Sequence, residues 1–345
     1  MKILLTADPE IPVPPRFYGG IERIVEFLVQ GLVEKGHNVT LMAHYDSSVG
    51  CTKLLPYSGK TSRSSLDTLN NIYALFKEIT TTRYDLIHSF GRLAYLIPAL
   101  PSNIPKLMSY QREPTLSGIT RAMAISKRNT LFFTGCSDYI TSQIKPLAPA
   151  FTIFNGVPIH KYDFQPEINN DAPLVFLGRI EHIKGTHLAI DIAKKTGRKL
   201  IIAGNIPSDS VAQTYFTEKI APQIDDQQIQ YIGPVDDQQK NMLLGQASAF
   251  LMPILWDEPF GIVMAEAMAC GTPVLALRRG SVPEIIIDGV NGFTGTTIED
   301  LITAVGKINQ IERLICRQVA EKKFSDQAIV SAYEQLYFKL INRSS

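Results

Sequence analysis

The sequence lacks the features that mark membrane, metal-binding and disulfide-stabilised proteins. No apolar run approaches the ~20 residues that a membrane-spanning helix needs. The four cysteines stand apart along the chain, so neither a zinc site nor a disulfide framework is expected. No Asp-x-Asp stretch and no cluster of histidines and cysteines is present to hold a divalent ion. These absences exclude an integral membrane protein and favour chemistry without a metal.

Two further function classes lack their usual signals. No basic run is interleaved with aromatic residues, so a nucleic-acid partner is not expected. The first apolar run is followed by Ala7-Asp8-Pro9-Glu10-Ile11-Pro12, where a dinucleotide-binding turn would need G-x-G-x-x-G. An NAD-dependent dehydrogenase is therefore excluded.

Length and charge indicate two domains of different character. The 345 residues, 45% of them hydrophobic, fit two domains of ~150–180 residues. Residues 1–160 carry 16 Lys+Arg and 11 Asp+Glu, whereas residues 161–345 carry 18 and 22, so the net charges are +5 and −4. A basic first half suits an acidic acceptor or peripheral contact with an anionic membrane surface. Ordinary variation in surface charge is the simpler explanation, and for the basic segment Arg121–Arg128 a solvated helix face is the safer interpretation.

The amino end does not read as a targeting segment. The apolar stretch Met1–Leu5 is too short before Asp8 to be the core of a signal peptide, and it reads as a strand. We therefore expect a cytoplasmic protein, with peripheral contact at the inner membrane face as the alternative.

Apolar strands alternate with amphipathic helices along the whole chain, which predicts an α/β fold with doubly wound parallel sheets. The expected strands are Lys2–Ala7, Val39–Ala43, Leu86–His88, Lys106–Ser109, Leu131–Gly135, Thr152–Phe154, Leu174–Leu177, Lys199–Ala203, Ile229–Ile232, Ala249–Met252 and Val274–Leu277. A proline-containing segment at 155–172 separates the two series. We predict domains at residues 1–157 and 158–325, followed by a segment 326–345 whose helix runs over Asp326–Asn342.

Two carboxylates flank a loop-to-helix junction late in the chain. Glu258 and Glu266 lie on either side of Phe260-Gly261, and the helix predicted over Ile262–Ala269 ends before Gly271-Thr272-Pro273. Unpaired N–H groups and the helix dipole make such a helix start an anion site. At a rise of ~1.5 Å per residue the carboxylates would lie roughly 10 Å apart, about the span of a diphosphate between two sugars.

Cations for that anion follow a predicted buried strand. Arg179 and Lys184 come after Leu174–Leu177, at the carboxyl end where open α/β sheets bind ligands. Arginine offers phosphate a planar fork and lysine a point charge. At the amino end, Gly19 and Gly20 open the helix predicted over Ile21–Lys35, where a backbone without side chains can approach a ligand closely.

Together these motifs resemble the retaining glycosyltransferases of family 4, which have the GT-B fold. The resemblance spans almost the whole chain and also includes the segments Asn155-Gly156-Val157, Gly280-Ser281-Val282-Pro283-Glu284 and Asp288-Gly289-Val290-Asn291-Gly292-Phe293. It implies two Rossmann-like domains facing a cleft, with the last helix crossing back to the first domain. The first domain would bind the acceptor and the second the nucleotide-sugar donor.

The resemblance also implies residue roles. Arg179 and Lys184 would neutralise the diphosphate, Glu258 would bind the transferred sugar, and Glu266 the ribose. The residues expected to bind the donor are Gly19, Gly20, Arg179, Lys184, Glu258, Phe260, Gly261, Ile262 and Glu266, and those on the sugar or acceptor side are Arg16, His88 and Gln111. Gln111 stands where many relatives carry a histidine, which puts a catalytic histidine in doubt.

Each role has a structural alternative. The two cations could be surface charges, Glu258 could cap the following helix, and Glu266 could be satisfied by internal hydrogen bonds. His88, at a strand end, is at least as well explained as a structural residue.

The sequence thus predicts retaining, metal-independent transfer of a hexose-type sugar from a nucleotide diphosphate, UDP foremost, to an acceptor hydroxyl. No cofactor is expected, because the nucleotide sugar is a substrate. The alternatives are a nucleotide-sugar epimerase of GT-B architecture and a non-catalytic nucleotide-sugar-binding module. The acceptor and the oligomeric state are not encoded in any motif that we recognise.

Overall fold

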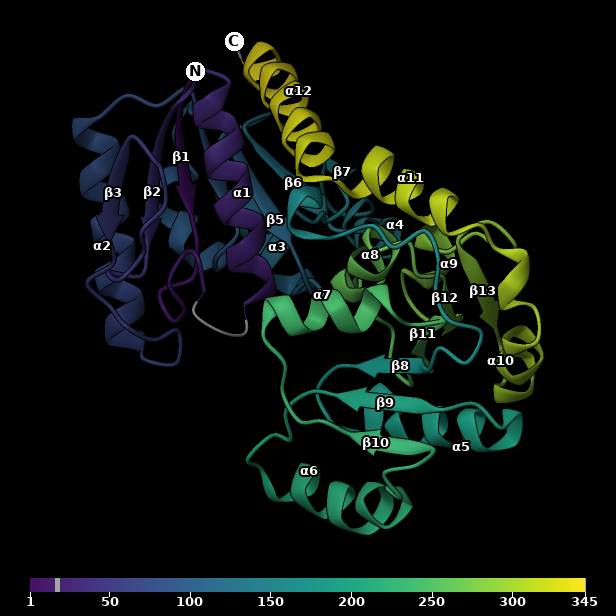
Figure 1. Ribbon diagram of the computed structural model, residues 1–345. Coiled ribbons are helices and arrows are strands. Elements are labelled where there is room, and N and C mark those ends of the chain that lie inside the picture. Colours follow the sequence, from purple (N-terminus) through teal and green to yellow (C-terminus); the bar gives the residue numbers. More distant parts are fainter. Residues whose placement is uncertain (16–18, 345) are drawn as a thin grey trace. The chain divides into compact units, whose positions relative to one another are not determined.

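The computed structural model of the protein describes residues 1–15 and 19–344 (Figure 1). The chain divides into two compact units. Unit 1 comprises residues 1–156 and the segment that begins at Asp326, and unit 2 comprises Val157–Ser325.

Unit 1 is built on a parallel sheet of seven strands in the order β3-β2-β1-β4-β5-β6-β7. The strands are β1 Lys2–Thr6, β2 Asn38–Ala43, β3 Lys53–Pro56, β4 Leu86–Ser89, β5 Lys106–Tyr110, β6 Leu131–Gly135 and β7 Ala150–Thr152. The α-helices are α1 Gly20–Glu34, α2 Ser65–Thr81, α3 Leu116–Ile125, α4 Asp138–Ile144 and α12 Asp326–Ser344. The order reverses between β1 and β4, since β2 and β3 lie on one side of β1 and the later strands on the other.

Unit 2 repeats this plan with six parallel strands in the order β10-β9-β8-β11-β12-β13. The strands are β8 Leu174–Leu177, β9 Leu200–Ala203, β10 Ile229–Tyr231, β11 Ala249–Met252, β12 Val274–Leu277 and β13 Gly292–Gly295. The α-helices are α5 Thr186–Thr196, α6 Ser210–Tyr215, α7 Asp237–Gly245, α8 Ile262–Ala269, α9 Val282–Ile285, α10 Ile298–Val305 and α11 Arg313–Phe324. Here the order reverses between β8 and β11.

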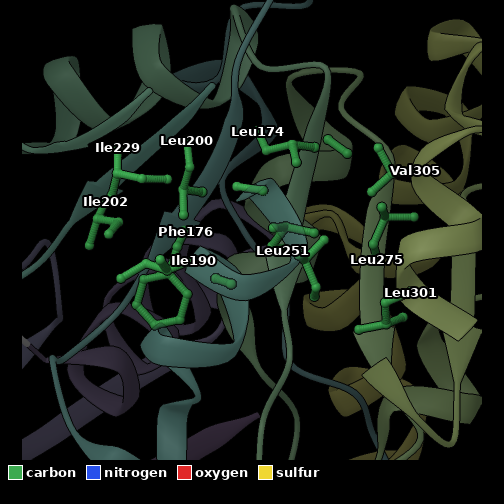
Figure 2. Close-up of a cluster of buried hydrophobic side chains, with 14 of the residues drawn as sticks. Leu174, Phe176, Ile190, Leu200, Ile202, Ile229, Leu251, Leu275, Leu301 and Val305 are labelled. Atoms are coloured by element: carbon green, nitrogen blue, oxygen red, sulfur yellow. The ribbon is translucent and has the colours of Figure 1, made fainter. Parts of the chain in front are cut away.

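Buried apolar side chains hold the unit 2 sheet to its helices. Phe176, Leu251 and Leu275 come from three strands, and they belong to one buried cluster with Ile190 of α5 and Leu301 of α10 (Figure 2). Parallel strands buried on both faces need such continuous apolar runs. This core fixes the strand ends from which the candidate site projects.

The predicted α/β class and doubly wound sheets are confirmed, with differences at particular elements. Residues 152–154 were expected as a strand, but the strand lies at Ala150–Thr152. β3 and β13 were not predicted from the sequence. α3 ends at Ile125, so the basic segment Arg121–Arg128 is not one continuous helix face.

Candidate functional site

The candidate site of unit 2 lies where the strand order reverses. β8 and β11 are neighbours, with Leu174 opposite Ala249 and Val175 opposite Phe250, and their carboxyl ends lead into the loops that carry Arg179, Lys184 and Glu258. Ligands of open α/β sheets bind in the crevice at such a reversal. The topology therefore brings together two of the sequence motifs that lie about 75 residues apart along the chain.

Glu258 is held by two side chains. Lys184 donates to its Oε2 atom at 2.9 Å, and the indole Nε1 of Trp256 donates to the same oxygen at 3.0 Å. The Lys184 Nζ atom also lies 4.8 Å from the centre of the Trp256 ring, within range of a cation–π interaction. Lys184 and Glu258 side chains are only 20% and 13% exposed, so their attraction is less screened than that of a surface pair.

Glu258 does not cap the following helix. α8 begins at Ile262 with Gly261 as its N-cap, and no side chain makes a capping hydrogen bond there. Gly261 has a φ of 75°, the left-handed conformation that glycine adopts without strain. The helix start thus keeps the N–H groups that a bound anion could use.

Gly280 and Ser281 pack against the loop that carries Glu258 and hold it in place. Ser281 donates its backbone N–H to the Glu258 carbonyl at 2.9 Å and its hydroxyl to the Phe260 carbonyl at 3.1 Å. A Cβ atom on Gly280 would lie 2.4 Å from the Glu258 carbonyl oxygen, closer than any real contact. Gly280 is therefore required for this close approach of the two loops.

Arg179 is the second cation of the site. Its guanidinium lies 3.2 Å from the Glu181 carboxylate and its side chain is 42% exposed. The Glu181 Oε2 atom is buried and makes no hydrogen bond of good geometry. A half-exposed guanidinium with one ionic partner has donors left for a phosphate.

Glu266, on α8, is satisfied within the protein. Its Oε1 atom accepts from Lys240 at 2.5 Å and from the Tyr162 hydroxyl at 2.7 Å, and the side chain is 6% exposed. The structure therefore provides the internal hydrogen bonds that the sequence left as an alternative to ribose binding. Neither bond uses Oε2, so a ribose role for Glu266 stays a prediction.

Three of these partners were not predicted from the sequence. Lys240, Tyr162 and Trp256 belong to no motif that was recognised, and two of them come from segments far from the residue they contact. Trp256 is the only tryptophan of the chain. Its position two residues before Glu258 was the one available signal that these two side chains are in contact.

In unit 1, Gly20 begins α1 and Gly19 is its N-cap. A Cβ atom on Gly19 would lie 2.9 Å from Oε2 of Glu22, a side chain of the first turn. A carboxylate therefore already lies beside this helix start, and donor binding by the two glycines stays a prediction. Arg16 lies outside the described residues.

His88 is completely buried and fully hydrogen-bonded. Its Nδ1 and Nε2 atoms lie 2.6 Å from the Tyr337 hydroxyl and the Ser109 hydroxyl. Burial lowers the pKa of His88 to about 3, so the ring is neutral near pH 7. These contacts favour the structural alternative, in which His88 attaches α12 to the sheet of unit 1.

Gln111, unlike His88, has no hydrogen-bond partner for its side chain. It follows β5, and both polar atoms of its amide are buried without a hydrogen-bond partner. Buried polar atoms without a partner cost free energy and are rare. Gln111 is thus better suited than His88 to meet a ligand.

Within residues 1–15 and 19–344, no helix combines the length and apolar character that crossing a bilayer would require.

A family model matches the second half of the chain, and solved structures share the fold of the whole chain. Residues 159–323 match the family model of the glycosyl transferases group 1. Spore coat protein SA of Bacillus subtilis (strain 168) is 23% identical, over 98% of this chain and 100% of its own. Sucrose-phosphate synthase of Thermosynechococcus elongatus superposes with a TM-score of 0.79 at 18% identity, over 99% of this chain and 100% of that one. Alr3699/HepE of Anabaena, solved in complex with UDP and glucose, superposes with a TM-score of 0.73 at 18% identity, over 97% and 99%.

Proposed function

We propose that this chain transfers a hexose-type sugar from a nucleotide diphosphate, UDP foremost, to an acceptor hydroxyl, with retention and without a metal. The match of residues 159–323 to the family model of the glycosyl transferases group 1 and the GT-B fold support the proposal. One observation carries the proposal. Two cations, the carboxylate of Glu258 and an uncapped helix start converge at the strand reversal of unit 2. The complex of Alr3699/HepE with UDP and glucose supports UDP as the first nucleotide to test.

Each residue would have a definite task. The bond between the anomeric carbon and the phosphate oxygen breaks, and its electron pair stays on the diphosphate. Arg179, Lys184 and the N–H groups at the start of α8 would stabilise that charge. Glu258 would bind hydroxyls of the transferred sugar. The acceptor oxygen would attack on the same face while its proton passes to the departing phosphate oxygen, so the configuration is retained without a covalent enzyme intermediate.

Donor binding would replace the contact between Lys184 and Glu258 by contacts of each residue with the donor. In the pair, the Lys184 charge is already compensated by a carboxylate. A diphosphate reaching Lys184 would weaken its attraction to Glu258 and free that carboxylate for sugar hydroxyls. Both events occur within contact distance of the Trp256 indole.

Trp256 provides a direct test of donor binding. Because it is the only tryptophan, any change of tryptophan emission on adding UDP or UDP-glucose reports on this site. We expect a saturable change for UDP that is retained in excess EDTA, and its loss in Arg179→Ala. Lys195→Ala, which removes an exposed lysine of α5, is the matched control. Absence of any change, together with absence of thermal stabilisation by UDP, would contradict the proposal.

The products separate the alternatives. UDP-glucose alone and UDP-glucose with acceptor would be incubated and analysed by mass spectrometry and NMR. An epimerised donor would indicate an epimerase, an unchanged donor a binding module, and a glycosylated acceptor with retained configuration the proposed transferase. The cytoplasmic location and peripheral membrane contact stay predictions.

A further inference from the structure

Helix α2 of unit 1 carries a row of large apolar side chains on its outer face (Figure 1). Leu66, Leu69, Tyr73 and Phe76 are 67%, 61%, 67% and 49% exposed. Their spacing places them within about 80° of one another around a helix that turns ~100° per residue. At a rise of ~1.5 Å per residue the row is roughly 15 Å long. We call these four side chains the α2 stripe.

The α2 stripe is not the face by which the helix packs on unit 1. Leu75 is completely buried, and Asn71 and Glu78, which are also buried, lie on the same inner side of the helix. Single exposed apolar residues are ordinary on a protein surface, but four in one row on a helix that already has a buried face are not. Contiguous exposed apolar surface of this kind marks an interaction site.

The charged residues around the α2 stripe are mainly basic. Residues 60–83 include four basic and two acidic residues. The basic ones are all exposed, two before α2, one on it and one after it: Lys60, Arg63, Lys77 and Arg83. Glu10, from the loop after β1, accepts from Ser62 and offsets part of the Arg63 charge. The stripe therefore has cations near both of its ends.

Both acidic residues of this segment are engaged by the protein. Asp67 accepts at 3.0 Å from the backbone N–H groups of Lys60 and Thr61. Glu78 is 8% exposed, and both of its carboxylate oxygens lie 3.0 Å from the ammonium of Lys53. A partner that covers the α2 stripe would thus meet apolar side chains and cations, with little opposing negative charge.

The neighbouring elements continue this surface. The 3₁₀ segment Leu93–Ala99 packs against both α2 and α3, and its Ile97 is 46% exposed. After α3, Lys127 donates its backbone N–H to the Leu100 carbonyl at 2.8 Å, which places this exposed lysine beside the end of the same segment. Arg128 follows and is exposed as well. Apolar and basic groups therefore continue beyond α2.

These charges discriminate between the partners that an apolar stripe can have. In a two-fold contact between two copies of the chain, antiparallel α2 helices centred between Leu69 and Tyr73 would bring Lys77 of one copy close to Arg63 of the other. Repulsion between like charges opposes that contact. An anionic lipid surface instead offers apolar chains beneath negative headgroups, which complement a row of leucine and aromatic side chains flanked by lysine and arginine.

We propose that the α2 stripe docks unit 1 on an anionic lipid surface. The four apolar side chains enter the boundary between headgroups and acyl chains, and the four exposed cations around them contact the headgroup phosphates. The backbone of α2 keeps its own helical hydrogen bonds, so docking requires no unfolding. The proposal does not rest on the proposed function, because binding to lipid involves neither donor nor acceptor.

Vesicle flotation of the whole protein tests the proposal. We expect binding to vesicles of phosphatidylcholine mixed with phosphatidylglycerol, weakened by salt, and little binding to phosphatidylcholine alone. Leu69→Gln combined with Tyr73→Gln should lower the partition coefficient at least tenfold, because two of the four inserted side chains are lost. Lys77→Gln should lower it about fivefold.

Unit 2 offers matched controls. Val211 of α6 is 75% exposed, so Val211→Gln removes an apolar side chain of comparable exposure, and Lys195→Gln removes an exposed lysine of α5. Both control variants should bind the anionic vesicles like the unmodified protein. Urea unfolding checks that the double variant retains its fold, and Leu66→Gln combined with Phe76→Gln replaces it if it does not.

Equal binding to both kinds of vesicle, no binding to the anionic vesicles, or unchanged binding in the double variant would overturn the proposal. Analytical ultracentrifugation without lipid tests the other partner. A dimer that the double variant dissociates would assign the α2 stripe to a contact between two copies, and would also overturn the proposal. UDP titration followed by Trp256 emission tests the proposed function separately, so either can fail while the other stands.

Discussion

The ammonium of Lys184 and the indole N–H of Trp256 donate to the same oxygen of Glu258, at 2.9 and 3.0 Å. A lysine expected to bind phosphate is thus tied to the carboxylate expected to bind sugar. Substituting either residue changes the environment of the other, so the effects of Lys184 and Glu258 variants should not be additive.

Replacing Arg179 or Lys184 by Ala should lower turnover at least tenfold. Each substitution removes a charge-assisted contact to the departing diphosphate, worth about 1.5–3 kcal/mol and more if it strengthens in the transition state. Steady-state kinetics with saturating donor would measure the effect, and Lys195→Ala should behave like the unmodified protein. Near-normal turnover in either site variant would rule out the phosphate assignment.

The two carboxylates should differ in their kinetic effects. Glu266→Gln should mainly raise the donor KM, because ribose contacts are similar in ground and transition states. Glu258→Gln should mainly lower kcat, because it touches the reacting sugar. Lys240→Met should resemble Glu266→Gln, since Lys240 holds the Oε1 atom of Glu266, and Lys240→Arg should restore part of the loss. The reverse pattern of KM and kcat would refute the orientation of the donor.

Gly280→Ala should impair donor binding through the Glu258 loop. Gly280 and Gly289 both have positive φ, 54° and 76°, but only a Cβ at Gly280 meets the Glu258 backbone, whereas Gly289 faces open space. Both alanine variants carry backbone strain, and only Gly280→Ala should also weaken UDP binding in the Trp256 titration. Equal UDP affinities in the two variants would show that the close contact between Gly280 and the Glu258 loop has no role in the site.

Glu22 should make stability depend on pH. Burial, with the charges of Asp8 and Glu10 adding to it, raises the pKa of Glu22 from 4.5 to about 7 in the folded protein, so its stabilising contribution is complete below pH 4.5 and is lost as pH rises through 7. Glu22→Gln cannot ionise, so its free energy of unfolding relative to the unmodified protein should increase by about 2–3 kcal/mol from pH 4.5 to pH 8. Urea unfolding at several pH values measures this, with Glu34→Gln, at the exposed opposite end of α1, as control. A constant difference across that range would contradict the environment assigned to Glu22.

His88 should support the fold and take no part in proton transfer. We expect His88→Ala to leave the shape of the pH–rate profile unchanged, while weakening unit 1 through the loss of its bonds to Ser109 and Tyr337. His88→Gln retains hydrogen-bonding groups and serves if the alanine variant does not fold. Disappearance of a titration near pH 6–7 in either variant would instead make His88 a catalytic group.

Sequence reasoning succeeded where a local pattern determines the structure. α8 begins and ends where the sequence predicted, because Gly261 and Gly271 flank a run that is apolar except for Glu266. β3 and β13 were missed for physical reasons. β3 is a half-exposed edge strand with a lysine and a proline, and β13 is a four-residue strand with glycine at both ends, a composition typical of turns.

The partners of site residues were less predictable than the residues themselves. Arg179 and Lys184 follow a recognisable strand, but the pairing of Glu266 with Tyr162 joins positions 104 residues apart. Such a pair depends on tertiary packing, which no spacing within one sequence encodes. The buried amide of Gln111 was likewise visible only once its surroundings were known.

The placement of α12 in unit 1 has a consequence for biosynthesis. Tyr333 and Tyr337 supply hydroxyls to the buried network of Ser109 and His88, yet the ribosome makes them after all of unit 2. Unit 2 is continuous and can complete its core without α12. Unit 1 must wait, because Ser109 and His88 lack their tyrosine partners until α12 is available. A released chain that ends at residue 325 should therefore expose unit 1 to proteases and chaperones while unit 2 is protected.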